Sequence, residues 1–192
     1  MINNLNRLAQ FTHIIYDFDR TIATIQIDWS KWHDFTRELI RKYEPQLAYP
    51  GGATIHLVQN EMVRKYGKSF RDAMSAFNEK FEFENYSACI PNSQLIKFIK
   101  ANPQKQQFIV TNQNRLLLNK LLLELGIAQL IERTITRDDV LFIKPDPEGI
   151  LKLIDPTVPL SQYIYVGDSD SDAIAAKAAR IEFERVENQN KN

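Results

Sequence analysis

Short apolar runs, separated by longer amphipathic stretches, recur at the beginning of the chain and throughout its second half. Continuous runs of this kind are typical of strands that are buried on both faces of a parallel sheet. The run Arg133–Thr136 has the weakest pattern of the set. The predicted strands are Thr12–Asp19, Gln107–Asn112, Arg133–Thr136, Tyr163–Asp168 and Ile181–Val186.

Helical periodicity fills the intervals between these runs. Asn114–Leu125 has a broad apolar face and stops before Gly126, a residue suited to the position that follows a helix. The other predicted helices are Ser93–Lys100, Asp146–Ile154 and Asp170–Arg180. Strands that alternate with helices predict an α/β fold, here a doubly wound parallel sheet covered by helices on both faces.

Residues 25–88 interrupt this alternation, because they contain no convincing buried strand. Nine basic and nine acidic side chains cancel within the segment, which argues against a polyanion-binding module. We therefore expect a core domain made of residues 1–24 and 89–192, with residues 25–88 inserted after the first strand as a small helical domain. Its predicted helices are Asp28–Tyr43, Ala53–Tyr66 and Ser69–Phe81.

Composition and charge argue against several classes of function. Of the 192 residues 44% are apolar, and 24 Lys and Arg balance 24 Asp and Glu, so we expect no general affinity for nucleic acid or an anionic membrane. The single Cys89 excludes an intramolecular disulfide and a zinc site built from several cysteines. We find no secretory signal pattern and no run near the roughly 18 apolar residues of a membrane span, so a cytoplasmic location is expected.

Two carboxylates end the first predicted strand. Asp17 and Asp19 are two residues apart, so an extended backbone would point both side chains the same way. One acid could attack a substrate while the other moves a proton. The plainer alternative is the start of a solvated loop, since a lone Asp-x-Asp is a weak motif.

Three further elements at strand ends or just beyond carry polar residues that could act with this pair. Thr111 and Asn112 could donate to phosphoryl oxygens, Lys144 before Pro145 could neutralise negative charge, and the acids from Asp168 to Asp172 suggest a hard cation. Each has a structural alternative: a turn or cap, a surface lysine in a proline turn, or a helix cap. Ligands of such sheets bind outside the carboxyl ends of the strands, where these elements would meet.

Together and in this order, the elements resemble the motifs of the haloacid dehalogenase superfamily. The resemblance covers Thr12 to about Arg180, with a helical insertion where the family often has a cap, and it favours the capped, phosphoglycolate phosphatase-like branch. The residues that match the motifs are Asp17, Asp19 and Thr21 for the first, Thr111 for the second, Lys144 for the third, and Gly167, Asp168 and Asp172 for the fourth.

The resemblance implies a phosphatase mechanism. Asp17 would be the nucleophile and Asp19 the general acid and base, with Lys144 as a further catalytic residue. Thr111, Asn112 and Lys144 would hold the phosphoryl group. Mg²⁺ would be bound by Asp17, by the backbone carbonyl of Asp19 and by Asp168, with Asp172 in support.

The resemblance leaves other functions open. A phosphomutase uses the same parts, and a non-catalytic binding or regulatory protein could retain the fold. A dehalogenase is disfavoured because Asp19 is present. The insertion predicts a small phosphorylated metabolite as substrate, with hinges near residues 24–26 and 88–92, but does not identify that metabolite. The sequence makes no prediction of the oligomeric state.

Two departures from the family pattern affect the expected structure. Arg20 stands where the family often has Gly, and we expect its side chain to face solvent. Arg180 stands where a helix often ends in Gly, so the helix is expected to end differently. Among the remaining residues, Trp29 and Trp32 are expected to be packing residues, and His33 and His56 structural histidines.

Overall fold

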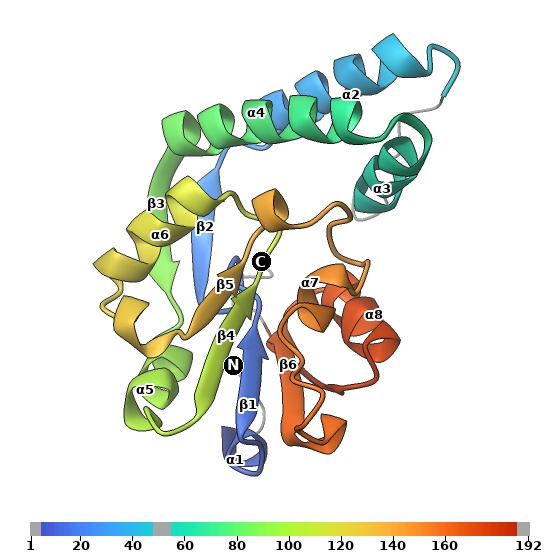
Figure 1. The fold of residues 1–192 in the computed structure, drawn as a ribbon. Coiled ribbons are helices and arrows are strands. Elements are labelled where there is room, and N and C mark those ends of the chain that lie inside the picture. The colour runs from blue at the N-terminus through green and yellow to red at the C-terminus, as the bar shows by residue number, and fades with distance from the viewer. Residues whose placement is uncertain (1–4, 48–54, 188–192) are drawn as a thin grey trace.

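The computed structural model describes residues 5–47 and 55–187. Its centre is a parallel sheet of five strands in the order β5-β4-β1-β6-β7, which confirms the predicted fold class (Figure 1). Every predicted core strand is present, and each is shorter at one end or both than its apolar run. Their bounds are β1 His13–Tyr16, β4 Gln106–Val110, β5 Arg133–Ile135, β6 Tyr163–Gly167 and β7 Glu182–Arg185.

Helices cover both faces of this sheet, as a doubly wound arrangement requires. Successive β1 side chains point to opposite faces: Ile14 and Tyr16 pack with α5 and α6, whereas Ile15 packs on the side of α7 and α8. Short 3₁₀ helices occupy Ala128–Leu130, Arg137–Asp139 and Leu160–Gln162. The core helices are α1 Leu5–Leu8, α5 Ser93–Ala101, α6 Arg115–Glu124, α7 Glu148–Leu151 and α8 Asp170–Ala178.

Two of these helices end differently from the prediction. α7 begins only after Pro147 and is shorter than the expected Asp146–Ile154. Arg180 follows α8 with a φ of 60°, so the expectation that arginine would avoid the left-handed position is wrong. Two backbone hydrogen bonds, Arg180 N to Lys177 O (3.1 Å) and Ile181 N to Ala176 O (3.1 Å), close the helix end and offset a cost of about 1 kcal/mol.

The inserted segment contains a feature that the pattern did not predict. β2 (Ala23–Ile27) and β3 (Tyr86–Pro91) pair antiparallel, so Thr24 lies opposite Ile90 and Gln26 opposite Ala88. The two expected hinge segments are therefore paired with each other in a ribbon. Burial along these strands alternates only partly, and a half-buried strand without a continuous apolar run is weakly marked in the sequence.

Three helices complete the insertion, which we call the cap: α2 Ser30–Tyr43, α3 Ile55–Tyr66 and α4 Lys68–Asn85. They match the predicted helices closely, although residues 53 and 54 of the second lie outside the described residues. Trp32, Phe70 and Phe81 form part of a separate apolar core inside the cap. The cap lies over the carboxyl ends of the core strands (Figure 1), and Phe142 of the core packs against it. In the described part of the chain no helix is long and apolar enough to cross a membrane.

Candidate active site

The first acidic residue follows directly on β1. The backbone N–H of Asp17 donates to Val166 O (2.8 Å) and so continues the parallel pairing of β1 with β6. This hydrogen bond fixes the carboxylate at the carboxyl end of the strand. Its side chain is buried, with Oδ1 accepting a hydrogen bond from Lys144 Nζ at 2.6 Å. Thr21 Oγ1 approaches Oδ2 at 3.4 Å. Burial raises the pKa of Asp17 above its ordinary value, although Lys144 opposes this shift.

Asp19 is tied to the base of the cap. Its Oδ1 accepts a hydrogen bond from the backbone N–H of Ile25 in β2 at 2.8 Å. Burial raises the pKa of Asp19 to about 7, and the negative charge of Asp168 adds to this effect, while the Ile25 hydrogen bond opposes it. A carboxyl group that titrates near neutral pH can both give and take a proton, which suits general acid and base chemistry.

Lys144 lies at the centre of the site. Its ammonium group has three N–H donors, and all are used: Asp17 Oδ1 at 2.6 Å, Asp172 Oδ1 at 2.6 Å and Tyr165 Oη at 2.9 Å. Burial disfavours the charged ammonium, but the two carboxylates outweigh it and the pKa of Lys144 is raised well above its ordinary value. The lysine is therefore a fixed cation held beside the candidate nucleophile.

The backbone of Lys144 is held in turn by Asn112. Asn112 Oδ1 accepts from Lys144 N (3.1 Å), and Asn112 Nδ2 donates to Lys144 O (3.2 Å). Both ends of this amide are therefore engaged, so the side chain positions Lys144. Asn112 also lines the cavity and keeps a second N–H, and its role in holding a phosphoryl group stays a prediction. Thr111 is buried at the end of β4 and lines the cavity, and its Oγ1 accepts from Gln113 N at 3.3 Å.

The fourth predicted element joins β6 to α8. Asp172 Oδ2 accepts from the backbone N–H and the hydroxyl of Ser169 (3.0 and 2.7 Å), which forms a capping box at the start of α8. Burial opposes ionisation of Asp172, but Lys144 and Ser169 outweigh it and lower its pKa. Gly167 is required here, because a Cβ would come within 2.6 Å of the Asp172 carboxyl group.

Asp17, Asp168 and Asp172 form a group suited to a divalent cation. One carboxylate oxygen from each lies within 4.8 Å of the others, and such hard oxygen donors match Mg²⁺ or Ca²⁺ chemistry. Asp172 accepts three hydrogen bonds of 2.6–3.0 Å through its two oxygens, whereas the second oxygen of Asp17 has only the 3.4 Å contact from Thr21. Asp17 and Asp168 are therefore the better direct ligands. The residues present therefore fit a metal, as the resemblance implied.

Arg20 lies beside this acidic group. Its Nε is 3.4 Å from Asp168 Oδ2, and its side chain is 52% exposed, so it borders both the site and solvent. The expectation that it would simply face solvent is only partly met. Its φ of 62° places a non-glycine residue in the left-handed region.

A cavity of about 390 Å³ opens over these groups between the core and the cap. It has one wall from the cap and one from the core, and several of its residues were not predicted. We interpreted the cap aromatic and imidazole groups as packing or structural residues, and Gln113 and Arg137 were not considered. The unpredicted lining residues are Trp29, Trp32, His33, Ile55 and His56 from the cap, and Gln113, Arg137, Ser169 and Ser171 from the core.

Among these unpredicted residues, only Gln113, Ser169 and Ser171 carried a signal in the sequence, which was their proximity to predicted site residues. Gln113 follows Thr111 and Asn112 directly, and a loop after a strand end usually contributes several groups to a site. The cap residues carry no motif. They reach the cavity only because the cap is docked on the core.

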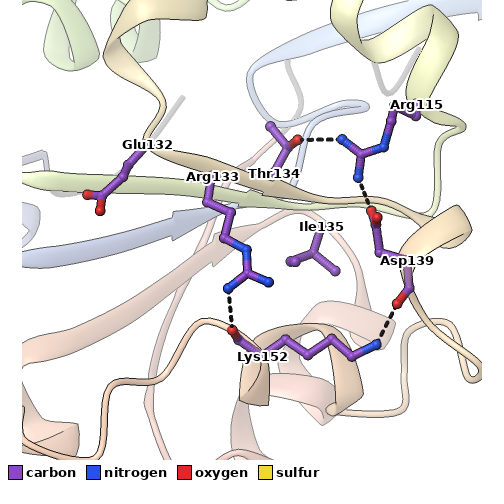
Figure 2. A pocket seen from close by; sticks show the side chains of 7 residues that line it. All are labelled: Arg115, Glu132, Arg133, Thr134, Ile135, Asp139 and Lys152. Atoms are coloured by element: carbon purple, nitrogen blue, oxygen red, sulfur yellow. Dashed lines mark hydrogen bonds and ion pairs between the residues drawn. The ribbon is translucent and has the colours of Figure 1, made fainter.

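A second pocket, of about 630 Å³, lies at the edge strand β5 (Figure 2). Its cations are already bound by neighbouring groups: Arg115 contacts Thr134 and Asp139, Arg133 donates to Lys152 O, and Lys152 Nζ pairs with Glu148. None of the four predicted motifs contributes to it. The cavity over Asp17 is therefore the candidate active site.

The fold and the site define a doubly wound α/β protein with a capped acidic centre at the carboxyl ends of its strands. The sequence profile of haloacid dehalogenase-like hydrolases matches residues 14–186. The chain therefore belongs to the haloacid dehalogenase-like hydrolase family.

Individual relatives agree with this assignment. A protein of Cupriavidus necator described as "Phosphoglycolate phosphatase, plasmid" is 40% identical over 75 residues, which are 38% of this chain and 32% of that protein. A solved structure from Bacteroides fragilis, provisionally assigned as a haloacid dehalogenase-like hydrolase, is 24% identical with a TM-score of 0.60 and covers 90% of this chain and 86% of its own. A solved structure from Lactobacillus plantarum, provisionally assigned as a phosphoglycolate phosphatase, is 19% identical with a TM-score of 0.54. It covers 91% of this chain and 85% of its own. The structural matches establish the fold.

Proposed function

We propose that this protein is a Mg²⁺-dependent phosphatase that hydrolyses a small phosphomonoester. The observation that carries the proposal is the buried contact of Lys144 with Asp17 and Asp172, next to Asp19. A fixed cation beside a nucleophilic carboxylate stabilises both the incoming phosphoryl group and the charge that develops on it. The family assignment and the similarity to a phosphatase over 75 residues support the same class of reaction.

The chain's own residues suit a two-step displacement. Lys144 holds Asp17 Oδ1 at 2.6 Å, whereas Oδ2 has only the longer 3.4 Å contact from Thr21 Oγ1, which favours Oδ2 as the attacking oxygen. Asp17 forms a bond to phosphorus while the bond to the leaving oxygen breaks, and Asp19 gives that oxygen its proton. Asp19 then takes a proton from water, which attacks the aspartyl-phosphate, releases phosphate and restores the Asp17 carboxylate.

Mg²⁺ would be held by carboxylates of Asp17 and Asp168 and by the backbone carbonyl of Asp19. When bound, it would neutralise charge on the phosphoryl oxygens and favour ionised Asp17. Thr111, Asn112 and Lys144 line the cavity and would hold the phosphoryl group. For this, the Lys144 ammonium would turn one of its three N–H groups from a present partner to a phosphoryl oxygen, while Asp172 keeps it in position.

The cap supports a small substrate. The cavity of about 390 Å³ accommodates a metabolite, whereas a folded phosphoprotein would have to displace the cap. A phosphomutase would use the same acids and lysine, and no particular observation favours it. A purely non-catalytic role is disfavoured by the raised pKa of Asp19 and the complete set of motif residues.

Phosphate release tests this proposal. We expect Mg²⁺-dependent release from at least one small phosphomonoester, abolished by EDTA. Asp17→Asn should lower the rate at least about a thousandfold without lowering the melting temperature. Asp170→Asn is the matched control, because Asp170 lies nearby but is exposed and pairs with Arg185. Activity of Asp17→Asn within tenfold of the wild type would disprove the assignment of the nucleophile.

A further inference from the structure

The candidate active site contains a polar group that the phosphatase mechanism does not use. Gln113 is 6% exposed and lines the cavity, and its Oε1 has no hydrogen-bond partner among the described residues. A buried acceptor left in this state costs about 1–3 kcal/mol, and native proteins contain few of them. Because Gln113 also lines the cavity, a ligand that reaches this buried oxygen would satisfy it.

The surroundings of Gln113 hold its backbone in place, and no described residue bonds its buried amide oxygen. Its N–H donates to Thr111 Oγ1 (3.3 Å), and its carbonyl accepts from Arg137 N (3.4 Å). The Arg137 guanidinium is engaged elsewhere, with Asn112 O and, at 3.7 Å, with Glu82 Oε1. Arg137, one of the cations of the cavity wall, is thus paired with a buried carboxylate.

The cap supplies the opposite wall without adding a strong charge. Its lining residues are Trp29, Trp32, His33, Ile55 and His56, none of which carries a carboxylate, amine or guanidinium. Burial, together with the positive charges of Arg137 and Lys144, lowers the pKa of His56 to about 4, so its imidazole is neutral at physiological pH. Trp32 donates its N–H to Asn78 Oδ1 (2.6 Å) and therefore offers no free polar group to a ligand.

From this arrangement we infer that Gln113 and the aromatic cap wall form a subsite for an uncharged, polyhydroxylated leaving group of monosaccharide size. The inference rests on the proposed phosphatase function. A ligand hydroxyl can donate to Gln113 Oε1, and because a hydroxyl also accepts, it can satisfy either orientation of the amide. The aromatic and imidazole groups would contact the C–H face of the sugar ring. In the orientation described, with Oε1 unpartnered, a leaving group bearing a carboxylate would place an acceptor against this acceptor.

A substrate panel separates this inference from the proposed function. The panel comprises pentose and hexose phosphates, their single-deoxy analogues, 2-phosphoglycolate, nucleoside 5′-monophosphates and p-nitrophenyl phosphate. We expect kcat/KM for the best monosaccharide phosphate to exceed the values for 2-phosphoglycolate and the nucleotides by at least about tenfold. One deoxy analogue should lose about ten- to a hundredfold, because it leaves the Gln113 acceptor unpaired.

Gln113→Leu tests the assignment to this residue. The variant should lower the ratio of kcat/KM for the sugar phosphate to that for p-nitrophenyl phosphate by about tenfold or more, and it should reduce the penalty of the deoxy analogue to near unity. Should the variant fail to fold, the deoxy series on the wild-type protein decides. A preference for 2-phosphoglycolate or nucleotides, or the absence of any deoxy effect, overturns the subsite and leaves the phosphatase intact. No Mg²⁺-dependent release from any compound overturns both proposals.

Discussion

At the scale of single residues, the site depends on how buried charges are balanced. Lys144 neutralises part of the charge of Asp17 and Asp172, but Asp19 and Asp168 add further negative charge nearby. An uncompensated buried carboxylate favours its protonated form, which explains the raised pKa of Asp19. Without a metal, this charge balance should make the protein less stable as the acids ionise.

The stability of the metal-free protein should therefore depend on pH through Asp19. Because the folded-state pKa is raised from 3.8 to about 7, the folded protein keeps a proton there that the unfolded chain has lost. Stability then falls as pH rises through this window, with the full penalty present above it. Asp19→Asn should melt at nearly the wild-type temperature at pH 4 and at least about 2 °C higher at pH 8. Equal differences at both pH values, in EDTA, would contradict this prediction.

Arg20 should compete with the metal for Asp168. Its Nε–Oδ2 distance of 3.4 Å and its 52% exposure describe a weak ion pair, which a bound cation would have to displace or share. Arg20→Gly removes this competitor and suits the φ of 62°. Calorimetric titration should show Mg²⁺ bound about two- to fivefold more tightly, with no loss of thermal stability. Weaker binding by the variant would mean that Arg20 orders the metal site.

At the scale of elements, the sequence predicted the strands and motifs that are continuous along the chain. It missed the strands and site residues that only the fold brings together. The core strands were evident because parallel strands buried on both faces are continuously apolar. β2 and β3 were not, because they are only half-buried and pair over a long sequence separation. Similarly, the motif acids and Lys144 were found at strand ends, whereas His33 and His56 meet the site only through docking of the cap.

The turn from β6 into α8 should be intolerant of any side chain at position 167. Gly167→Ala would place its Cβ 2.6 Å from the Asp172 carboxyl group and displace the partner of both Lys144 and Ser169. We expect a loss of about 1–3 kcal/mol in stability, measured by denaturant unfolding, together with a clear loss of phosphatase activity. Gly67→Ala is the control, since it strains the backbone at a φ of 66° but nothing lies within 4 Å of its Cβ position; it should lose stability without losing activity. Wild-type behaviour of Gly167→Ala would refute this role.

At the scale of the whole molecule, the described structure is a closed form in which the cap is hydrogen-bonded to the core. Asn60 in α3 exchanges two hydrogen bonds with the backbone of Ile143, at 2.7 and 3.0 Å. Arg71 donates to Val140 O (3.3 Å), and Glu82 accepts from the backbone and the side chain of Asn114 (3.1 and 2.7 Å). These contacts fix loops that begin or border the active site, so cap position and site geometry are coupled.

Loss of the Asn60 contacts should shift the protein towards an open cap. Asn60 is buried, so Asn60→Ala removes both hydrogen bonds and leaves the Ile143 groups unpaired, which disfavours the closed form by about 1–3 kcal/mol. An open cap admits water and separates the cap wall from Gln113 and Lys144, which weakens electrostatic stabilisation of the phosphoryl group. We expect kcat/KM for small phosphomonoesters to fall at least about fivefold.

The same opening should relax the discrimination against large substrates. The ratio of kcat/KM for a small phosphomonoester to that for a phosphopeptide should fall in Asn60→Ala, and small-angle scattering should show a larger radius of gyration. Glu61→Ala is the matched control, because Glu61 is the next residue of α3 and is exposed. An unchanged ratio together with an unchanged radius would show that Asn60 stabilises the cap without controlling its closure. A wild-type preference for the phosphopeptide would mean that the cap is a docking surface, and the small-substrate prediction would then be wrong.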